Sequence, residues 1–320
     1  MIPQRLLLSC VSEDRPAFHA RVESLVGSAR RLGGSLARSP VVVNMVESAD
    51  RAFVQRMEAL NAEVRVVPRM TTGGVAHVNK LRMLEVQARE DFDVLLAVDC
   101  DVAVAEDPAS RVSGDAISVV PADKDPFTDD QWRQIFDGLA LKPWERSIRA
   151  ITTGRPMYPY FNSGVIGVPR TLCADLLAAW TQAVKDLDGL WRRQPDIIPR
   201  AKRFYTDQIA LAVALSRGLP CTVISSELNF PTHVALHDSM VQGLRPALLH
   251  YHSEVDDEGF LFRPRCPVAE LAADRVNRSH AQALELSYQG MRARPDDSQL
   301  HRTFSRLMAM VPAAARSMIR

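Results

Sequence analysis

Short apolar runs that alternate with helical patterns dominate the first hundred residues of this 320-residue chain. The runs span residues 6–11, 41–46, 64–67 and 94–98, and apolar residues recur at helical spacing around 17–32, 50–60 and 79–89. A run of Val and Leu without polar alternation is typical of a strand covered on both faces, and strands that alternate with helices form parallel sheets. We therefore predict a doubly wound α/β unit, whose ligands bind at the carboxyl ends of the strands.

The pattern becomes irregular from Pro121 to Pro159, where prolines, glycines, acids and aromatic residues surround one predicted helix near 130–139. Long segments of this kind often bind substrate, so we expect an insertion on the acceptor side of a site. Regular patterns then resume, with strands predicted at 161–168, 221–225 and 247–252 and helices at 171–187 and 206–216. We expect one domain over residues 1–265, with a mostly parallel sheet flanked by helices, and a helical C-terminal extension over 266–320.

Composition limits the partners and the location of the protein. Lys and Arg number 39 and Asp and Glu 38, so the net charge of +1 gives no general attraction to nucleic acid, and we expect no nucleic-acid partner. The five cysteines form no CxxC pair, and no apolar stretch approaches 18 residues, so we expect a cytoplasmic protein without a disulfide framework.

The C-terminal segment 292–320 is basic, with six arginines against two aspartates. Leu300, Phe304, Leu307 and Val311 recur there at helical spacing. An amphipathic basic helix of this kind can lie on the inner face of the plasma membrane, which would make the protein peripheral. The same stripe can instead pack on its own domain, and the sequence leaves both alternatives open.

Two acids follow the fourth apolar run, as Asp99-Cys100-Asp101. In an extended segment side chains alternate with period two, so both carboxylates would project to the same side. Two carboxylates at the edge of a parallel sheet suit Mg²⁺ or Mn²⁺ held together with substrate phosphates. The alternative is a pair of solvated acids in a turn.

Three further motifs contain polar side chains of the types found in catalytic and binding sites. His250-Tyr251-His252 follows an apolar run, and an imidazole ligand would favour Mn²⁺ over Mg²⁺, although a lone core histidine is the simpler alternative. The segment 160–166 (YFNSGVI) places Gly164, which permits close approach of a ligand, beside the amide of Asn162. Asp207 and Gln208 stand at a predicted helix start, where Thr206 could equally be a plain N-cap.

In this order and spacing, the four motifs resemble those of the GT-A fold glycosyltransferases. The chain looks most like the retaining family 8 type, which includes glycogenin and bacterial lipopolysaccharide glycosyltransferases, and the resemblance spans about residues 5–253. It implies a nucleotide-diphospho-sugar transferase fold and the transfer of a hexose, with UDP-hexose as the default donor. The acceptor implied is a bacterial glycan, a glycolipid or another small molecule, and the oligomeric state stays open.

The resemblance also implies roles for individual residues. Asp99, Asp101 and His250 match the metal ligands, and His252 competes with His250 for that role. Asn162, Asp207 and Gln208 match catalytic positions near the donor sugar. The remaining donor contacts are expected from Ser9, Val11 and Lys80, with Asp99, Asp101 and His252. The family's Lys-Pro-Trp segment after the histidine is absent, so Arg263 or Arg265 would have to contact the phosphates instead.

The chemistry implied is stabilisation of a leaving nucleotide diphosphate by a divalent ion, with Asp207 near a sugar that develops positive charge. Retention or inversion is left open by the residues, and an inverting reaction would need a base such as Asp207 or Asp123. Two other functions remain as alternatives. One is a haloacid dehalogenase-type phosphatase with Asp99 as nucleophile, and the other is a noncatalytic protein that binds a sugar nucleotide.

Overall fold

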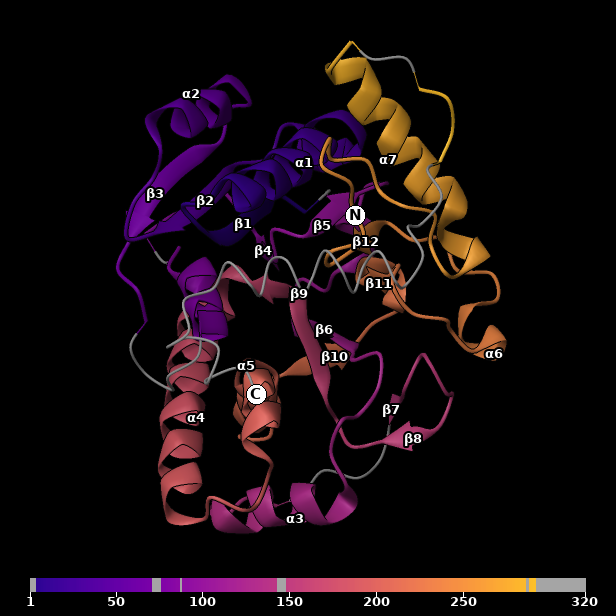
Figure 1. The fold of residues 1–320 in the computed structure, drawn as a ribbon. Coiled ribbons are helices and arrows are strands. Elements are labelled where there is room, and N and C mark those ends of the chain that lie inside the picture. Colours follow the sequence, from indigo (N-terminus) through magenta and orange to yellow (C-terminus); the bar gives the residue numbers. More distant parts are fainter. Residues whose placement is uncertain (1–3, 71–75, 87, 143–147, 286–287, 292–320) are drawn as a thin grey trace, which may run out of the picture.

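A seven-stranded sheet forms the centre of the computed structural model, which describes residues 4–70, 76–86, 88–142, 148–285 and 288–291 (Figure 1). In spatial order its strands are β10 (Cys221–Val223), β6 (Ile117–Pro121), β9 (Phe161–Pro169), β4 (Val94–Val98), β1 (Leu6–Glu13), β2 (Val41–Val46) and β3 (Glu63–Val67). Only β9 runs antiparallel to its neighbours in this sheet. The predicted mostly parallel sheet is therefore confirmed.

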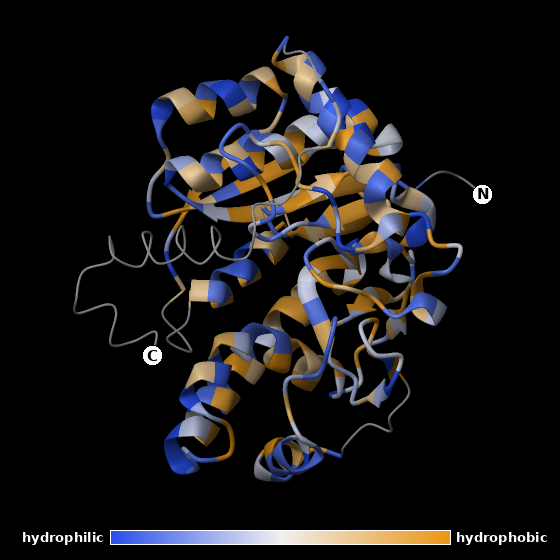
Figure 2. Ribbon diagram, turned by 45° about the vertical axis from the view of Figure 1, so that its right-hand side comes forward, coloured by the Kyte–Doolittle hydropathy of each residue, from blue (hydrophilic) through white to orange (hydrophobic). Residues whose placement is uncertain are grey.

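Helices cover both faces of the sheet. The helices α1 (Pro16–Leu32) and α2 (Arg51–Ala59) lie on one side, and α4 (Cys173–Arg193) and α5 (Thr206–Leu215) lie on the other (Figure 1). Neighbouring residues of β1 show the division, because Leu6 and Leu8 belong to the core under α1, whereas Leu7 belongs to the core under α4 and α5. Figure 2 shows the resulting apolar strands between helices whose outer faces are polar. This is the doubly wound arrangement that the sequence predicts.

The helix predicted at 79–89 is wrong in type and in extent. The chain forms a 3₁₀ helix there, η2 (Ala76–Leu84). Val78, Leu81 and Leu84 are all buried, and residues three apart share one face of a 3₁₀ helix, so the apolar spacing fits this tighter winding. The winding also turns Asn79 and Lys80 into the interior.

A small second sheet, which the sequence analysis did not predict as a unit, brings distant segments to the edge of the main sheet. It pairs β11 (Phe230–Pro231), β12 (Leu248–His250) and β5 (Val102–Val104) in that order. The register places His250 opposite Val102, one residue after Asp101. This pairing positions the acids after β4 beside the histidines near the end of β12.

The predicted insertion contains α3 (Asp129–Gly138) and a two-stranded hairpin of β7 (Ile148–Arg149) and β8 (Pro156–Met157). Helix α3 begins with a capping box, in which Thr128 and Gln131 satisfy each other's backbone N–H groups. The helix predicted at 130–139 is therefore confirmed, and the hairpin was not predicted.

The short helix α6 (Asp238–Val241) precedes β12, and the chain after β12 continues into α7 (Glu270–Ala283). Ala273 and Val276 of α7 share a buried cluster with Leu249 and Tyr251, so the start of the predicted extension packs on the same domain as β12. Residues 292–320, on which the predicted membrane-binding helix falls, lie outside the described residues.

The 3₁₀ helices besides η2 are η1 (Gly34–Ala37), η3 (Ala109–Arg111), η4 (Arg170–Leu172), η5 (Arg200–Tyr205), η6 (Ser226–Leu228) and η7 (Pro267–Ala269). Among the described residues, no helix is both long enough and apolar enough to cross a bilayer.

Candidate active site

Asp99 and Asp101 lie where β4 ends and the chain turns into β5. The assumption that this motif is extended is wrong, because Cys100 and Asp101 form a turn. Backbone hydrogen bonds fix the turn, since Asp99 N donates to Gly164 O at 2.8 Å and Tyr251 N donates to Asp101 O at 3.0 Å. Both carboxylates nevertheless line the same cavity.

This cavity has a volume of about 480 Å³ and lies at the carboxyl edge of β4. It receives the predicted site residues from five separate segments, namely Lys80, Asp99, Asp101, Asn162, Asp207, Gln208, His250 and His252. A smaller cavity of about 310 Å³ shares Lys80, Asp99 and Asp101 with it and continues past Val11 towards α1. The two together form a two-part site, with the acids between the parts.

Asp101 and two histidines form a cluster that could hold a metal ion. His250 Nε2 lies 3.3 Å from Asp101 Oδ1, and His252 Nδ1 lies 3.9 Å from Asp101 Oδ2. The two imidazole rings stack with centroids 3.9 Å apart, and one ligand atom from each of the three residues lies within 4.8 Å of the others. Asp99 is outside this group, so its predicted role as a metal ligand stays a prediction.

The orientation of His250 is set by two neighbours that hold its ring. Its Nδ1 lies 2.9 Å from Asn229 Oδ1, and with the amide oxygen facing the ring this nitrogen donates, which leaves Nε2 directed at Asp101. On its other side the ring touches the backbone at Gly164, where a Cβ atom would lie 2.5 Å from His250 Cε1. The glycine of the YFNSGVI segment is therefore required by the close approach of His250.

The charges of this cluster depend on one another. The partial burial of the Asp101 carboxylate opposes ionisation, but the neighbouring His250, His252 and Arg21 together hold the pKa of Asp101 well below its usual range. Burial alone would lower the pKa of His250, yet the charge and hydrogen bond of Asp101 raise it. For His252, burial and then the charge of His250 lower the pKa to about 2, so this imidazole is neutral, as a metal ligand must be.

A buried lysine joins Asp99 to the predicted catalytic acid. Lys80 Nζ lies 2.7 Å from Asp99 Oδ2 and 3.2 Å from Asp207 Oδ2. The same Nζ donates to Ser163 Oγ at 3.0 Å, and Ser163 Oγ donates to Asp207 Oδ2 at 2.7 Å. Burial works against the charge on Lys80, but Asp99 and Asp207 outweigh it and raise its pKa. For Asp99 burial dominates and raises the pKa, although Lys80 opposes the shift.

Arg21, which the sequence analysis missed, reaches the acids from helix α1. Its Nη1 lies 3.8 Å from Asp101 Oδ2, and its guanidinium lies 5.4 Å from the ring centroid of Phe18. Both residues line the smaller cavity. Arg21 therefore presents a cation between the acid cluster and this cavity, and nothing in its sequence surroundings distinguishes it from other helix arginines.

Of the other residues predicted to contact the donor, one lines a cavity and one lies in the interior. Val11 lines the smaller cavity. Ser9 is fully buried inside the sheet, where its Oγ accepts from Asn44 Nδ2 at 3.1 Å, so it does not reach either cavity. Neither Arg263 nor Arg265 is among the residues that line these two cavities.

The amide predicted to be catalytic is fixed from its own strand, because Asn162 Oδ1 accepts from Gly164 N at 2.8 Å. The site also contains residues that the sequence analysis missed, namely Ser163, Asn229 and His233. Ser163 could have been found from its place next to Asn162. Asn229 and His233 lie in a segment without a recognisable motif, and only β11 brings them to the site.

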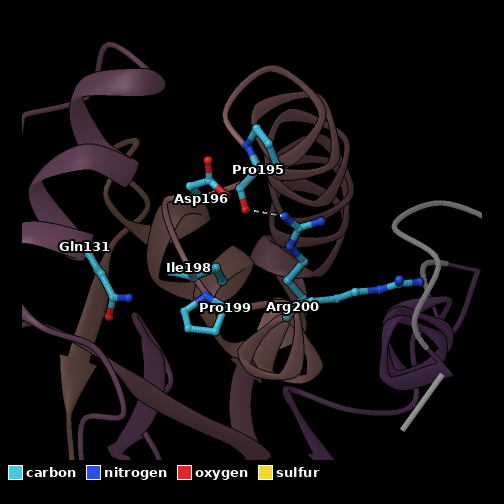
Figure 3. A pocket seen from close by; sticks show the side chains of 7 residues that line it. Gln131, Pro195, Asp196, Ile198, Pro199 and Arg200 are labelled. Atoms are coloured by element: carbon cyan, nitrogen blue, oxygen red, sulfur yellow. Dashed lines mark hydrogen bonds between the residues drawn. The ribbon is translucent and has the colours of Figure 1, made fainter. Parts of the chain in front are cut away.

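A larger cavity of about 550 Å³ lies elsewhere, at the end of α4 (Figure 3). Two prolines, an isoleucine and two arginines form most of its wall, and Arg203 there donates to the carbonyl oxygen of Pro195 at 2.7 Å. Its lining includes one acid, Asp196, and no histidine or cysteine. Size alone would favour this cavity as the active site, but the titratable groups that converge around Asp101 favour the cavity there.

One family of known proteins matches more than half of the chain. The model of the Rhodobacterales glycosyltransferase domain matches residues 23–218. Among curated protein sequences, none is significantly similar to the chain.

Solved structures with a similar course of the chain include mouse xyloside xylosyltransferase 1 in its apo form, with a TM-score of 0.44 and 11% identity over 78% of this chain and 98% of that one. The galactosyltransferase LgtC in complex with donor and acceptor sugar analogs has a TM-score of 0.46 and 12% identity, over 92% of this chain and 99% of that one. An active-site mutant of LgtC has a TM-score of 0.49 and 14% identity with the same coverage.

Proposed function

The chain belongs to the family of Rhodobacterales glycosyltransferase domains, and from this premise we propose that it transfers a hexose from a UDP-sugar in a metal-dependent reaction with retention. The acceptor we propose is a glycan or glycolipid. One observation carries the metal-dependent part of this proposal. Asp101 from the turn after β4 meets His250 and His252 near the end of β12, beside a cavity large enough for a ligand.

The ligand set fits a transition metal better than magnesium. One carboxylate and two imidazoles are available, and imidazole suits Mn²⁺ whereas Mg²⁺ prefers oxygen ligands. Two of the features that a metal site requires are present without the ion, because His252 is neutral and Asn229 holds Nε2 of His250 towards Asp101. When bound, the ion would act as a Lewis acid on the diphosphate of the donor.

Arg21 is the residue that we assign to the diphosphate in place of Arg263 or Arg265. Its guanidinium lies beside Asp101 and lines the cavity that runs from the acids to Val11. A guanidinium forms bidentate hydrogen bonds with phosphate oxygens and stays charged at every physiological pH. The uracil and ribose of the UDP-sugar would then occupy the smaller cavity, on the side of α1.

The sugar would lie on the other side of the acids, near Asp207. The hydrogen bond from Ser163 and the ion pair with Lys80 hold the Asp207 carboxylate in a fixed position. A carboxylate held in this way can accept hydrogen bonds from sugar hydroxyls and can stabilise the positive charge of an oxocarbenium-like transition state. Gln208 and the amide of Asn162 line the same cavity and supply neutral hydrogen-bonding groups.

An exposed aromatic side chain supports an acceptor site at the mouth of the cavity around Asp101. Phe204 is 55% exposed and packs edge-on against His77, with centroids 4.2 Å apart. Both line the cavity, together with Lys124 and Pro126 of the insertion. Aromatic faces provide a rigid surface for the apolar face of a hexose, so this rim is where we place the acceptor.

The phosphatase alternative is disfavoured by the family match and by the state of Asp99. Asp99 Oδ2 is held by Lys80 Nζ at 2.7 Å, and only 15% of the Asp99 side chain is exposed. The family match likewise favours an enzyme over a noncatalytic binding protein.

A thermal-shift screen of nucleotide sugars, each with and without Mn²⁺, tests the proposal. A ligand that binds only the folded state at 100 times its dissociation constant adds about 2.7 kcal/mol of stability. We expect a UDP-hexose to raise the melting temperature only when Mn²⁺ is present. If no nucleotide sugar shifts the melting temperature under either condition, the proposed donor class is wrong.

A further inference from the structure

A second group of metal-ligating side chains adjoins the first and shares one histidine with it. Asp123 follows β6, His233 follows β11 and His252 follows β12, and all three line the cavity around Asp101. One ligand atom from each of them lies within 4.8 Å of the others. The rings of His233 and His252 meet edge-on with centroids 4.1 Å apart.

The separation of Asp123 and His233 is close to that of two ligands of one ion. His233 Nε2 lies 3.6 Å from Asp123 Oδ2, which is longer than an ordinary hydrogen bond. Two ligands about 2.1 Å from a tetrahedral ion lie about 3.4 Å from each other, so the observed separation is close to that of a shared cation.

The two nitrogens of His252 face different partners. Its Nδ1 is on the side of Asp101, at 3.9 Å from Oδ2. Its Nε2 is buried and has no hydrogen-bond partner. A neutral imidazole has one lone pair and one N–H group, so a proton on Nδ1 directs the lone pair of Nε2 outward as a metal ligand. The sequence Asp101, His252, metal would then be a carboxylate–histidine–metal arrangement, in which His252 binds the second ion and the first ion keeps Asp101 and His250 as its ligands.

We propose that Asp123, His233 and His252 form a second divalent-cation site, for an ion such as Zn²⁺, Co²⁺ or Mn²⁺, next to the site of Asp101 and His250. Two imidazoles and one carboxylate are a ligand set that these metals accept and that Mg²⁺ does not favour. Three protein ligands leave a coordination position open to water or to a substrate hydroxyl group, as in catalytic rather than structural zinc sites.

Metal binding to the full chain tests this inference without any sugar nucleotide. Co²⁺ is titrated into the protein, and the number of bound ions and their dissociation constants are measured by visible absorption and by equilibrium dialysis. We expect two ions per chain in the wild type. Asp123→Asn and His233→Gln should each lose the second ion or bind it at least about tenfold more weakly, because both remove a direct ligand. His237→Gln, an exposed histidine outside both groups, is the matched control and should retain both ions.

Asp101→Asn separates the two sites and the two proposals. This variant should lose the first ion and keep the ion that depends on Asp123 and His233. If Asp123→Asn and His233→Gln bind Co²⁺ with the number and affinity of the wild type, the inference is overturned, whatever Asp101→Asn does. A single wild-type ion that responds only to Asp101→Asn also overturns it and leaves the proposed function intact. A single ion that responds to His233→Gln but not to Asp101→Asn supports the second site and contradicts the first. Circular dichroism of each metal-free variant verifies that it is folded.

Discussion

Replacement of Gly164 by alanine should disable the candidate metal site through sterics alone. A Cβ at this position would lie 2.5 Å from His250 Cε1 and 2.9 Å from His250 Nδ1, whereas ordinary contact begins at 3.4 Å. The ring, or the strand that carries Gly164, must therefore move by about 0.9 Å, from the difference of 3.4 and 2.5 Å. Such a movement is large beside the 2.9 Å hydrogen bond with Asn229 and the 3.3 Å approach to Asp101.

Two magnitudes follow from this displacement. Overpacking of a well-packed interior costs about 1–3 kcal/mol of stability, so the free energy of unfolding should fall by that amount. Misorientation of a metal-ligating histidine weakens metal binding by about 10–100-fold. The loss of metal affinity should therefore exceed what a general loss of stability would cause, because most molecules remain folded.

The assay combines urea unfolding with a titration of Mn²⁺ or Co²⁺ into the folded protein. Gly189→Ala in helix α4 is the control, since a Cβ there meets only the flexible end of Arg193, at 3.2 Å. Alanine is favoured over glycine in a helix by about 1 kcal/mol, so this variant should be as stable as the wild type or more so. Unchanged metal affinity in folded Gly164→Ala would refute the reasoning that this close approach positions His250.

Three further predictions concern the neighbours of the site. Arg21→Ala should raise the KM or Kd for the nucleotide-sugar donor by about tenfold or more without a large loss of stability. Replacement of the exposed Arg192 by alanine is the control and should leave donor binding unchanged. Equal effects of the two replacements would show that Arg21 does not contact the donor. Asn229→Ala should weaken metal binding by about 10–100-fold because His250 loses its orientation, and a titration with the affinity of the wild type would contradict this. In the metal-free protein, the raised pKa of His250 contributes stability below about pH 6.5 that is lost as the pH rises through the folded pKa, and the lowered pKa of Asp101 contributes stability above about pH 4 that is lost as the pH falls. The difference in melting temperature between wild type and Asp101→Asn should thus be largest between about pH 4 and 6.5, and a difference that stays constant to pH 9 would contradict the coupling.

The parts of the fold that were predicted correctly are those whose signal is local. Val41–Val46 and Val94–Val98 are continuous apolar runs between helical patterns, and both are strands of the main sheet with the expected bounds. The small sheet could not be predicted, because β11 has only two residues and β5 only three, too few to show a period. Its strands are defined by pairing with partners that lie far away in the sequence.

The same distinction applies to the site. Asp101 and His250 were identified because each follows an apolar run at a strand end, and the structure brings them within 3.3 Å of each other. Arg21 was missed because an arginine on the surface of an amphipathic helix has no local feature that reveals its neighbour. The resemblance assigned Ser9 to the donor, and the structure places its side chain inside the sheet, where Asn44 contacts it. Which face a central strand residue occupies depends on packing that the apolar run does not encode, since both faces are buried.

Donor hydrolysis measured as UDP release, with and without Mn²⁺, tests most directly whether the acid and histidine cluster serves a glycosyltransferase. The account predicts release that requires Mn²⁺ in the wild type and falls at least about 100-fold in Asp101→Ala, as expected when a group that stabilises transition-state charge is removed. Asp175→Ala, an exposed acid on α4, should retain the wild-type rate. An Asp101→Ala enzyme that releases UDP as fast as the wild type would contradict the claim that a metal at this cluster holds the donor.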